Sequence, residues 1–157
     1  LYVEDMDLWK FKKSYTREIL STINLSDFDF LKWDKLSKEI EDKNTKKKYI
    51  EAGKKIIEYQ NKTIEEMVQK AKKVKIGRHK ALVVNSSILI SEIGAALIKK
   101  MPPLAIILFE AGKEKRVSLR SNGKIDVSKI AEKYGGGGHK KAAAFALAAK
   151  APFPWKE

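Results

Sequence analysis

Residues 117–145 read VSLRSNGKIDVSKIAEKYGGGGHKKAAAF, and this stretch decides how the C-terminal half of the chain is interpreted. Its first residues alternate between apolar and polar side chains, which is typical of a half-buried β-strand. Val117 and Leu119 are expected to face a core, while Ser118 and Arg120 face the other way. A strand arginine beside a hydroxyl is a suitable pair of groups for holding a phosphate.

The second half of the stretch carries a glycine run. Apolar residues recur at helical spacing over 125–134, and Asp126 is the expected N-cap of that helix. Gly135, Gly136, Gly137 and Gly138 follow, and HKKAAA after them is predicted to start a short helix. Glycines that lead into a helix N-terminus form an anion site from backbone N–H groups, with His139 in the first turn. A glycine run that only caps a helix is the alternative.

Outward from this stretch, the pattern indicates an α/β domain with a small mixed sheet and flanking helices. Short apolar runs predict strands over 79–85, 102–110 and 113–121, and the order of elements is β-α-β-β-α-loop-α-β. A helix over 86–100 separates the first two strands, with Ser87 or Ser91 as its N-cap.

The N-terminal half has helical periodicity throughout. Trp33, Leu36 and Ile40 share one helical face, and residues 45 to about 73 form one long amphipathic helix. That helix is predicted either to connect two domains or to lie along its own core. The domains expected are 1–44 as a helical segment, 45–76 as the connecting helix and 77–157 as the α/β domain.

Charge sets limits on the partners. The 33 Lys and Arg against 20 Asp and Glu give a net charge of +13, which indicates either a polyanionic partner or a lysine-rich solvated surface. The basic turn GRHK contains Arg78 and Lys80, which are candidates for extending a surface that binds a nucleic-acid backbone. The absence of cysteine excludes disulfides and fits a cytoplasmic location, and no apolar run reaches membrane-spanning length.

With these residues in hand, the chain resembles the C-terminal part of DHH-family phosphoesterases, in the oligoribonuclease (nanoRNase) branch. The glycine-histidine motif and Ser118-Leu119-Arg120 resemble the signature of the DHHA1 domain. VVNSSILISEIGAAL resembles an N…SE-G block of that branch, and LYVEDMDLWKF resembles the end of its catalytic DHH domain. The chain also opens without an initiator methionine, so we expect it to begin inside a longer protein.

The resemblance implies a substrate-binding domain of a phosphodiesterase that uses two manganese ions. It implies that Ser118, Arg120, Gly135 to Gly138 and His139 bind the phosphate of a short oligonucleotide or phosphorylated nucleotide. It also implies that Asp5, or Asp7 in its place, is a metal ligand together with a catalytic half that carries the Asp-His-His motif. That motif does not occur in this sequence, and Ala144 stands where the family has glycine.

Two other functions stay open. One is a non-catalytic module that binds RNA or single-stranded DNA, because DHHA1 domains also occur in alanyl-tRNA synthetases. The other is an oligomerisation domain, in which the long helix is the face of a homodimer. The sequence assigns no catalytic residue.

Overall fold

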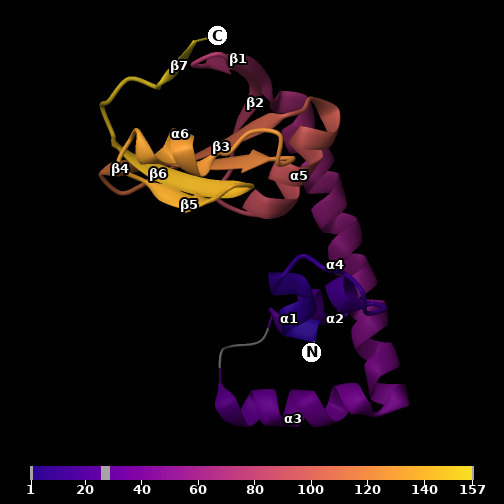
Figure 1. The fold of residues 1–157 in the computed structure, drawn as a ribbon. Coiled ribbons are helices and arrows are strands. Elements are labelled where there is room, and N and C mark those ends of the chain that lie inside the picture. The colour runs from indigo at the N-terminus through magenta and orange to yellow at the C-terminus, as the bar shows by residue number, and fades with distance from the viewer. Residues whose placement is uncertain (1, 26–28, 157) are drawn as a thin grey trace. The chain divides into compact units, whose positions relative to one another are not determined.

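The computed structural model describes residues 2–25 and 29–156. The chain divides into two compact units, Leu1–Lys62 and Thr63–Glu157 (Figure 1). The helix α4 (Lys43–Lys70) begins in the first unit and ends in the second. No helix among the described residues is long and apolar enough to cross a membrane.

The first unit consists of helices. They are α1 (Tyr2–Asp7), α2 (Thr16–Ile23), α3 (Phe30–Glu41) and the first part of α4. Ile19, Leu20 and Ile23 of α2 form its buried core. Trp33, Leu36 and Ile40 of α3 pack against that core, so the predicted apolar face of this helix is confirmed.

Aspartates define the boundaries of α3 and α4. Asp29 precedes α3, and its carboxylate accepts hydrogen bonds from the backbone N–H of Leu31 at 2.8 Å and Lys32 at 3.3 Å. Asp42 does the same before α4, accepting from the backbone N–H of Asn44 and from Thr45. Each aspartate satisfies N–H groups that have no partner inside their helix.

The second unit is a mixed sheet with flanking helices, so the predicted α/β class is confirmed. The strands are β1 (Lys72–Ile76), β2 (His79–Asn85), β3 (Leu104–Ala111), β4 (Glu114–Ser121), β5 (Gly137–His139), β6 (Ala142–Ala148) and β7 (Trp155–Lys156). Their order across the sheet is β5-β6-β4-β3-β2-β1-β7. Among the described strands, β2 and β3 pair in parallel and are connected by α5 (Ile90–Lys100), and the other pairs are antiparallel.

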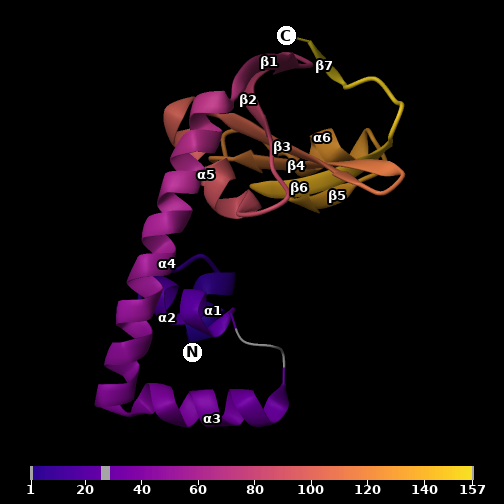
Figure 2. The ribbon, with the colours of Figure 1, turned by 180° about the vertical axis from the view of Figure 1, so that it is seen from behind.

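Apolar layers lie on both faces of this sheet. On one face, Val127 and Ala131, at and within α6 (Ser128–Glu132), pack with Ile106, Val117 and Leu119. On the other, Ile93 and Leu97 of α5 and Ile64 of α4 pack with Ala105 and Ile107. Figures 1 and 2 show α5 and α6 against the sheet from opposite views. The strands of the sheet centre are therefore buried on both sides, as their continuous apolar sequence requires.

The structure corrects several predicted elements. The long helix runs over Lys43–Lys70 rather than 45 to about 73, and residues 72–76 form strand β1 instead of continuing the helix to 76. β1 is held by antiparallel pairing with β2 in a hairpin that turns at Gly77-Arg78, which the helical periodicity of the preceding sequence does not show. The C-terminal segment, which lacks a clear pattern, adds β7 beside β1.

The predicted helix N-caps in the second unit are also corrected. α5 begins at Ile90 after Leu89, which has a φ of 51°, and neither Ser87 nor Ser91 caps it. α6 begins at Ser128, so Val127 occupies the cap position that was predicted for Asp126. The carboxylate of Asp126 still accepts hydrogen bonds from the Ser128 N–H at 3.1 Å and the Ser128 hydroxyl at 2.7 Å.

The predicted helix after the glycine run does not form, and this is the largest correction. Gly137–His139 form β5, and Ala142–Ala148 form β6. The alanines alternate between buried Ala143 and the exposed Ala144, because the strand lies on the apolar core with one face only. Their helix propensity is outweighed by pairing with β4 along the full length of β6.

Candidate functional site

The strand β4 presents its side chains as the alternating pattern predicts. Val117 and Leu119 are completely buried in the core on the α6 face. Ser118 and Arg120 therefore lie on the opposite face, and both are partly exposed. In the second unit α5 packs on this opposite face, against β3 and β4.

Strand pairing brings the predicted site residues together. Arg120 lies opposite Ala142 of β6, and Ala142 lies opposite His139 of β5. Directly opposite residues of antiparallel strands share a face. Arg120, Ala142 and His139 consequently form one row across three strands, and the backbones of its ends are about 10 Å apart.

A second row lies beside the first. Ser118 pairs with Ala144, and Ala144 pairs with Gly137. We call the two rows together the β4–β6–β5 surface, consisting of Arg120, Ala142, His139, Ser118, Ala144 and Gly137. Its centre consists of alanine methyl groups, so nothing large separates the polar groups on its two sides.

Residues of α5 hold the Arg120 side chain in place. Its guanidinium donates to the Ser91 hydroxyl at 3.3 Å and to the Leu119 carbonyl at 3.1 Å. A Cβ added to Gly94 would lie 2.6 Å from the Arg120 Cγ. The absence of a side chain at Gly94 therefore leaves the space that the stem of Arg120 occupies. Burial lowers the pKa of Arg120 and the nearby Glu92 carboxylate opposes this, and the guanidinium keeps its charge.

The glycines of the run have different roles. The Gly135 N–H donates to the Glu132 carbonyl at 3.1 Å, and the Gly136 N–H donates to the Ala131 carbonyl at 3.0 Å. Gly135 has a φ of 75°, so this is the Schellman arrangement that ends α6. The N–H groups of Gly135 and Gly136 are thus already engaged by α6. A glycine directly after the last turn of a helix was the signal for this role.

Gly138 allows β5 to lie close against β6, whereas Gly137 does not make such a contact. A Cβ on Gly138, which has a φ of 143°, would lie 2.5 Å from the Ala143 Cα. A Cβ on Gly137 would meet nothing within 4 Å. The predicted helix dipole is absent from this site, and His139 stands on an exposed edge strand instead of a helical turn.

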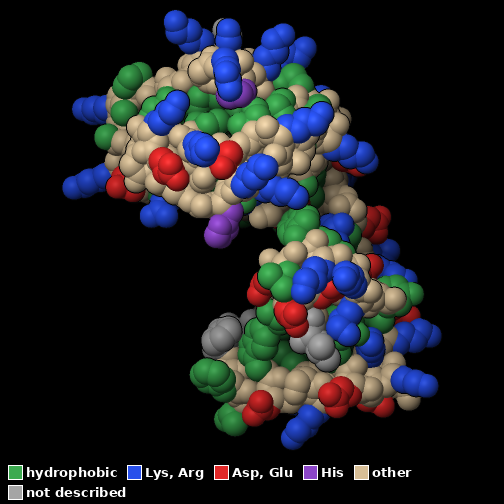
Figure 3. All heavy atoms as spheres, viewed as in Figure 1, with side chains coloured by type: hydrophobic (Ala, Val, Ile, Leu, Met, Phe, Trp, Pro, Cys, Tyr) green, Lys and Arg blue, Asp and Glu red, His purple; other side chains and the backbone are tan. Residues whose placement is uncertain are grey.

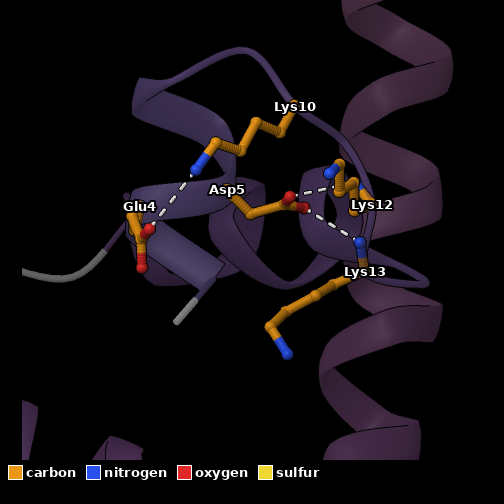
Figure 4. A network of polar contacts seen from close by, with 5 residues as sticks. All are labelled: Glu4, Asp5, Lys10, Lys12 and Lys13. Carbon is orange, nitrogen blue, oxygen red and sulfur yellow. Dashed lines mark hydrogen bonds and ion pairs between the residues drawn. The ribbon is translucent and has the colours of Figure 1, made fainter.

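Asp5, the predicted metal ligand, lies in the first unit and has a structural environment of its own. One carboxylate oxygen accepts from the Lys12 N–H at 2.9 Å, and the other accepts from the Lys13 N–H at 3.1 Å and the Thr16 hydroxyl at 2.6 Å. Figure 4 shows the carboxylate enclosed by this loop. The Thr16 hydrogen bond, with the two backbone bonds and the Lys13 charge, lowers the pKa of Asp5 despite its burial.

The described residues do not by themselves supply the ligands of a two-manganese centre. No group of three or more His, Asp or Glu side chains suited to a metal ion occurs among the described residues. Glu4, next to Asp5, is paired with Lys10 at 3.5 Å (Figure 4). The manganese ions and the metal role of Asp5 or Asp7 remain predictions.

Comparison with known families gives one match over most of the second unit. A family model described as the DHHA1 domain matches residues 58–151. This range contains the β4–β6–β5 surface, α5 and the glycine run.

Two curated proteins are similar in sequence. An uncharacterized protein of Acanthamoeba polyphaga mimivirus is 30% identical over 158 residues, covering 93% of this chain and 36% of that protein. The oligoribonuclease NrnB of Bacillus subtilis is 37% identical over 93 residues, covering 56% of this chain and 23% of that enzyme. This chain therefore spans about a third or less of the length of these relatives.

Solved structures share the fold at lower sequence identity. A phosphodiesterase from Vibrio cholerae described as specific for pGpG, PggH, matches with a TM-score of 0.57 and 11% identity, over 95% of this chain and 60% of that one. An uncharacterized protein from Helicobacter pylori matches with a TM-score of 0.50 and 17% identity, over 98% of this chain and 54% of that one.

Proposed function

The chain belongs to the DHHA1 domain family, and from that premise we propose that its β4–β6–β5 surface binds the phosphate of a nucleotide or short oligonucleotide. In the complete protein this domain is the substrate-binding half of a metal-dependent phosphodiesterase of the DHH family. The similarity in sequence to an oligoribonuclease supports a short nucleic-acid substrate.

The row Arg120–Ala142–His139 is the observation that carries this proposal. In this row Arg120 and His139 belong to one face of the sheet on either side of Ala142, where β4, β6 and β5 follow one another. A phosphate above Ala142 would accept from Arg120 on one side and from His139 on the other. Ser118 and the backbone of Gly137 lie one row further along the strands, where they contact the next part of the ligand.

Arg120 is the main phosphate ligand in this arrangement. Its hydrogen bonds to Ser91 and Leu119 fix the guanidinium, and its remaining N–H donors are available to two phosphate oxygens. Because the side chain is already ordered by Gly94 and Ser91, little conformational entropy is lost when a ligand binds.

A non-catalytic module for RNA or single-stranded DNA is the second candidate function. The net charge of +13 favours it. Figure 3 shows Lys and Arg side chains spread over the visible face of the second unit, with few Asp and Glu among them. Such binding is dominated by many phosphate contacts and weakens steeply with salt.

The test is the affinity of the chain for a 5′-phosphorylated dinucleotide with a fluorescent 3′ label. We expect Arg120→Ala to weaken binding by about tenfold to a hundredfold, because a charge-assisted, bidentate contact is lost. His139→Ala weakens it less. Lys99→Ala, which removes an exposed charge from the far end of α5, is the matched control and leaves the affinity unchanged.

Hydrolysis separates the two candidate functions. The labelled dinucleotide is incubated with manganese and either this chain or the longest natural form of its gene. Cleavage by the long form that is lost in Arg120→Ala supports the phosphodiesterase. Binding without cleavage by either form supports the non-catalytic module. In that case removing any one lysine should weaken binding to a similar extent. An unchanged affinity in Arg120→Ala overturns the proposed phosphate surface.

A further inference from the structure

A basic pocket lies on the face of the sheet opposite the β4–β6–β5 surface. It has a volume of about 560 Å³. The side of the sheet follows from Ile76, which lines the pocket and belongs to the same core layer as Leu119. Leu119 points away from the face that carries Ser118 and Arg120.

Three segments of the second unit enclose this pocket. The first is the tight turn Gly77-Arg78 between β1 and β2, in which Gly77 has a φ of 55°. The second is the loop 124–126 before α6, which is fixed by a hydrogen bond of 2.6 Å from the Ser121 hydroxyl to the Ile125 carbonyl. The third is α6 with the turn after it. The lining is therefore built from ordered elements, since β1–β2 pairing and Ser121 position two of the three.

Positive charge dominates the rim. Arg78, Lys124, Lys129 and Lys133 line the pocket together with His79, against the single carboxylate of Asp126. That carboxylate accepts two hydrogen bonds from Ser128, and these bonds are the main cause that lowers its pKa. The pocket therefore carries an excess of cationic groups that one carboxylate does not balance.

The floor of the pocket is apolar and includes an aromatic ring. Ile76 is 3% exposed, and Ile125 and Ile130 pack partly buried against the same core. Tyr134, 37% exposed, stacks on Phe145 with the ring centroids 4.7 Å apart. This stacking holds the tyrosine ring in a fixed orientation, so it can serve as a platform for a flat ligand group.

We propose that this pocket is a second binding site and that it takes a nucleoside monophosphate unit, with the phosphate among Lys129, Lys133 and Arg78 and the base over Tyr134 and the isoleucine floor. The volume lies in the range of pockets that hold small organic ligands. A cationic rim above an apolar, aromatic floor complements a ligand that combines a phosphate with a planar base.

Spacing along α6 and the turn after it supports the placement of the phosphate. Lys129 and Lys133 are four residues apart, and so are Ile130 and Tyr134. Residues four apart lie one above the other on a helical face. Lys133 follows the end of α6 with a helical backbone, so Lys129 and Lys133 lie on one side of the pocket and Ile130 beside them. Tyr134 lines the pocket from the turn after α6, which gives the site a phosphate end and a base end.

The test uses the whole 157-residue chain and follows its backbone amides by NMR during titration with AMP, adenosine and inorganic phosphate. We expect AMP to shift the amides of 77–79 and 124–134 in a saturable manner. Adenosine and inorganic phosphate each bind at least about tenfold more weakly, because each lacks one half of the contacts. Tetra-adenylate with and without a 5′ phosphate shows whether the unit is recognised free or at the end of a chain.

Variants assign the effect to the pocket. We expect the double variant Lys129→Ala/Lys133→Ala to weaken AMP binding by about tenfold, since two charge contacts are lost. The double variant Lys99→Ala/Lys113→Ala removes the same charge elsewhere in the unit and leaves the affinity unchanged. Equal weakening by both double variants, equal affinity for phosphate and AMP, or shifts confined to 118–120 and 137–144 would each overturn the proposal.

This proposal does not rest on the proposed function, because the two sites use opposite faces of the sheet. Arg120→Ala is expected to leave the AMP shifts in 77–79 and 124–134 intact. If Arg120→Ala leaves dinucleotide binding unchanged while the pocket variants abolish AMP binding, the proposed function fails and the second site stands. The reverse result removes the second site alone.

Discussion

The two units of the molecule are stabilised in different ways. The second unit has apolar layers on both faces of its sheet, and many of its strand residues are completely buried. Among the described residues of the first unit, Ile19, Leu20 and Ile23 alone make up the buried core, and most of the exposed large apolar side chains belong to this unit. A small core leaves less hydrophobic stabilisation to offset chain entropy, so specific polar contacts matter more in the first unit.

Polar contacts in the first unit join segments that are far apart in sequence. The Thr22 hydroxyl donates to the Tyr49 carbonyl at 2.9 Å, and Lys46 donates to the Tyr2 hydroxyl at 2.6 Å. The Tyr49 hydroxyl donates to Glu39, and burial together with this carboxylate raises the pKa of Tyr49 to about 12. The comparison shows that the sheet unit is held by packing, whereas the helical unit depends on individual bonds and close backbone contacts.

The close helix contact at Gly53 provides the largest expected effect. A Cβ at this buried position of α4 would lie 1.9 Å from the Glu18 carbonyl oxygen of α2, and backbone cannot move aside as a side chain can. We expect Gly53→Ala to lower the free energy of unfolding of the first unit by about 3 kcal/mol. Hydrogen exchange should show lost protection in α2, while β3 and β4 keep theirs.

Ala52→Gly is the control for the helix propensity of α4, because residue 52 is exposed. It should cost only about 1 kcal/mol. If Gly53→Ala is no more destabilising than Ala52→Gly, or if it reduces protection equally in the sheet, the two units are not separately stabilised.

Glycines in β5 give the second test, at the edge of the sheet. Gly138→Ala introduces a Cβ 2.5 Å from the Ala143 Cα at a φ of 143°, and we expect it to destabilise the second unit by about 2 kcal/mol. Gly137→Ala, in open space, should change stability by less than about 0.5 kcal/mol. Thermal unfolding measures both, and equal effects would show that β5 does not depend on its close approach to β6.

The glycine run shows where prediction from sequence succeeded and where it failed. The α/β class, the strands β2, β3 and β4, and the separation of Leu119 from Arg120 follow from alternation and apolar runs, which are local patterns. The helix predicted over HKKAAA was wrong because helix propensity is weak beside the pairing of β6 with β4. The strand partner of β6 lies more than twenty residues earlier, and no local pattern identifies it.

The sequence predicted which residues belong to the candidate site better than it predicted how they are arranged. Pairing brings Arg120 and His139 into one row, but as members of strands and without a helix dipole. Gly135 ends α6, a role that a glycine after the last helical turn indicates. The contact between Gly94 and Arg120 joins residues that are distant in sequence, and only the packing of α5 on the sheet shows it.

The Asp5 carboxylate makes the stability of the first unit dependent on pH. Its pKa is lowered from 3.8 in the folded state, so the stabilisation it provides is complete above that value and is lost as the pH falls through the folded pKa. Asp5→Asn keeps one acceptor oxygen and loses the charge. We expect wild type to be more stable than Asp5→Asn at neutral pH, with a difference that shrinks below pH 3.8.

The measurement is hydrogen exchange of the α2 amides at increasing urea concentration, for both proteins at several values of pH. The difference between the two free energies of unfolding at each pH cancels the titration of all other groups. A difference that stays constant through the acid range would show that the charge of Asp5 contributes nothing and that only the shape of the side chain matters. The sheet of the second unit, which Asp5 does not contact, should show no difference between the proteins.

A substitution with a small expected change in stability tests the positioning of Arg120. A Cβ at Gly94 would lie 2.6 Å from the Arg120 Cγ and 3.2 Å from the Ile107 Cδ1, so Gly94→Ala displaces the arginine stem. Alanine is the better helix former by about 1 kcal/mol, which offsets part of the strain, and the net change in stability should stay within about 1 kcal/mol. Affinity for the phosphorylated dinucleotide should fall by about threefold to tenfold, because the guanidinium loses its fixed position.

Ala95→Gly is the matched control, because residue 95 is exposed on the same helix. It should lower stability by about 1 kcal/mol and leave the affinity unchanged. Gly94→Ala is thus expected to lower affinity with little change in stability, whereas Ala95→Gly lowers stability and leaves affinity unchanged. If affinity follows stability in both variants, α5 supports the sheet but does not position Arg120 for phosphate binding.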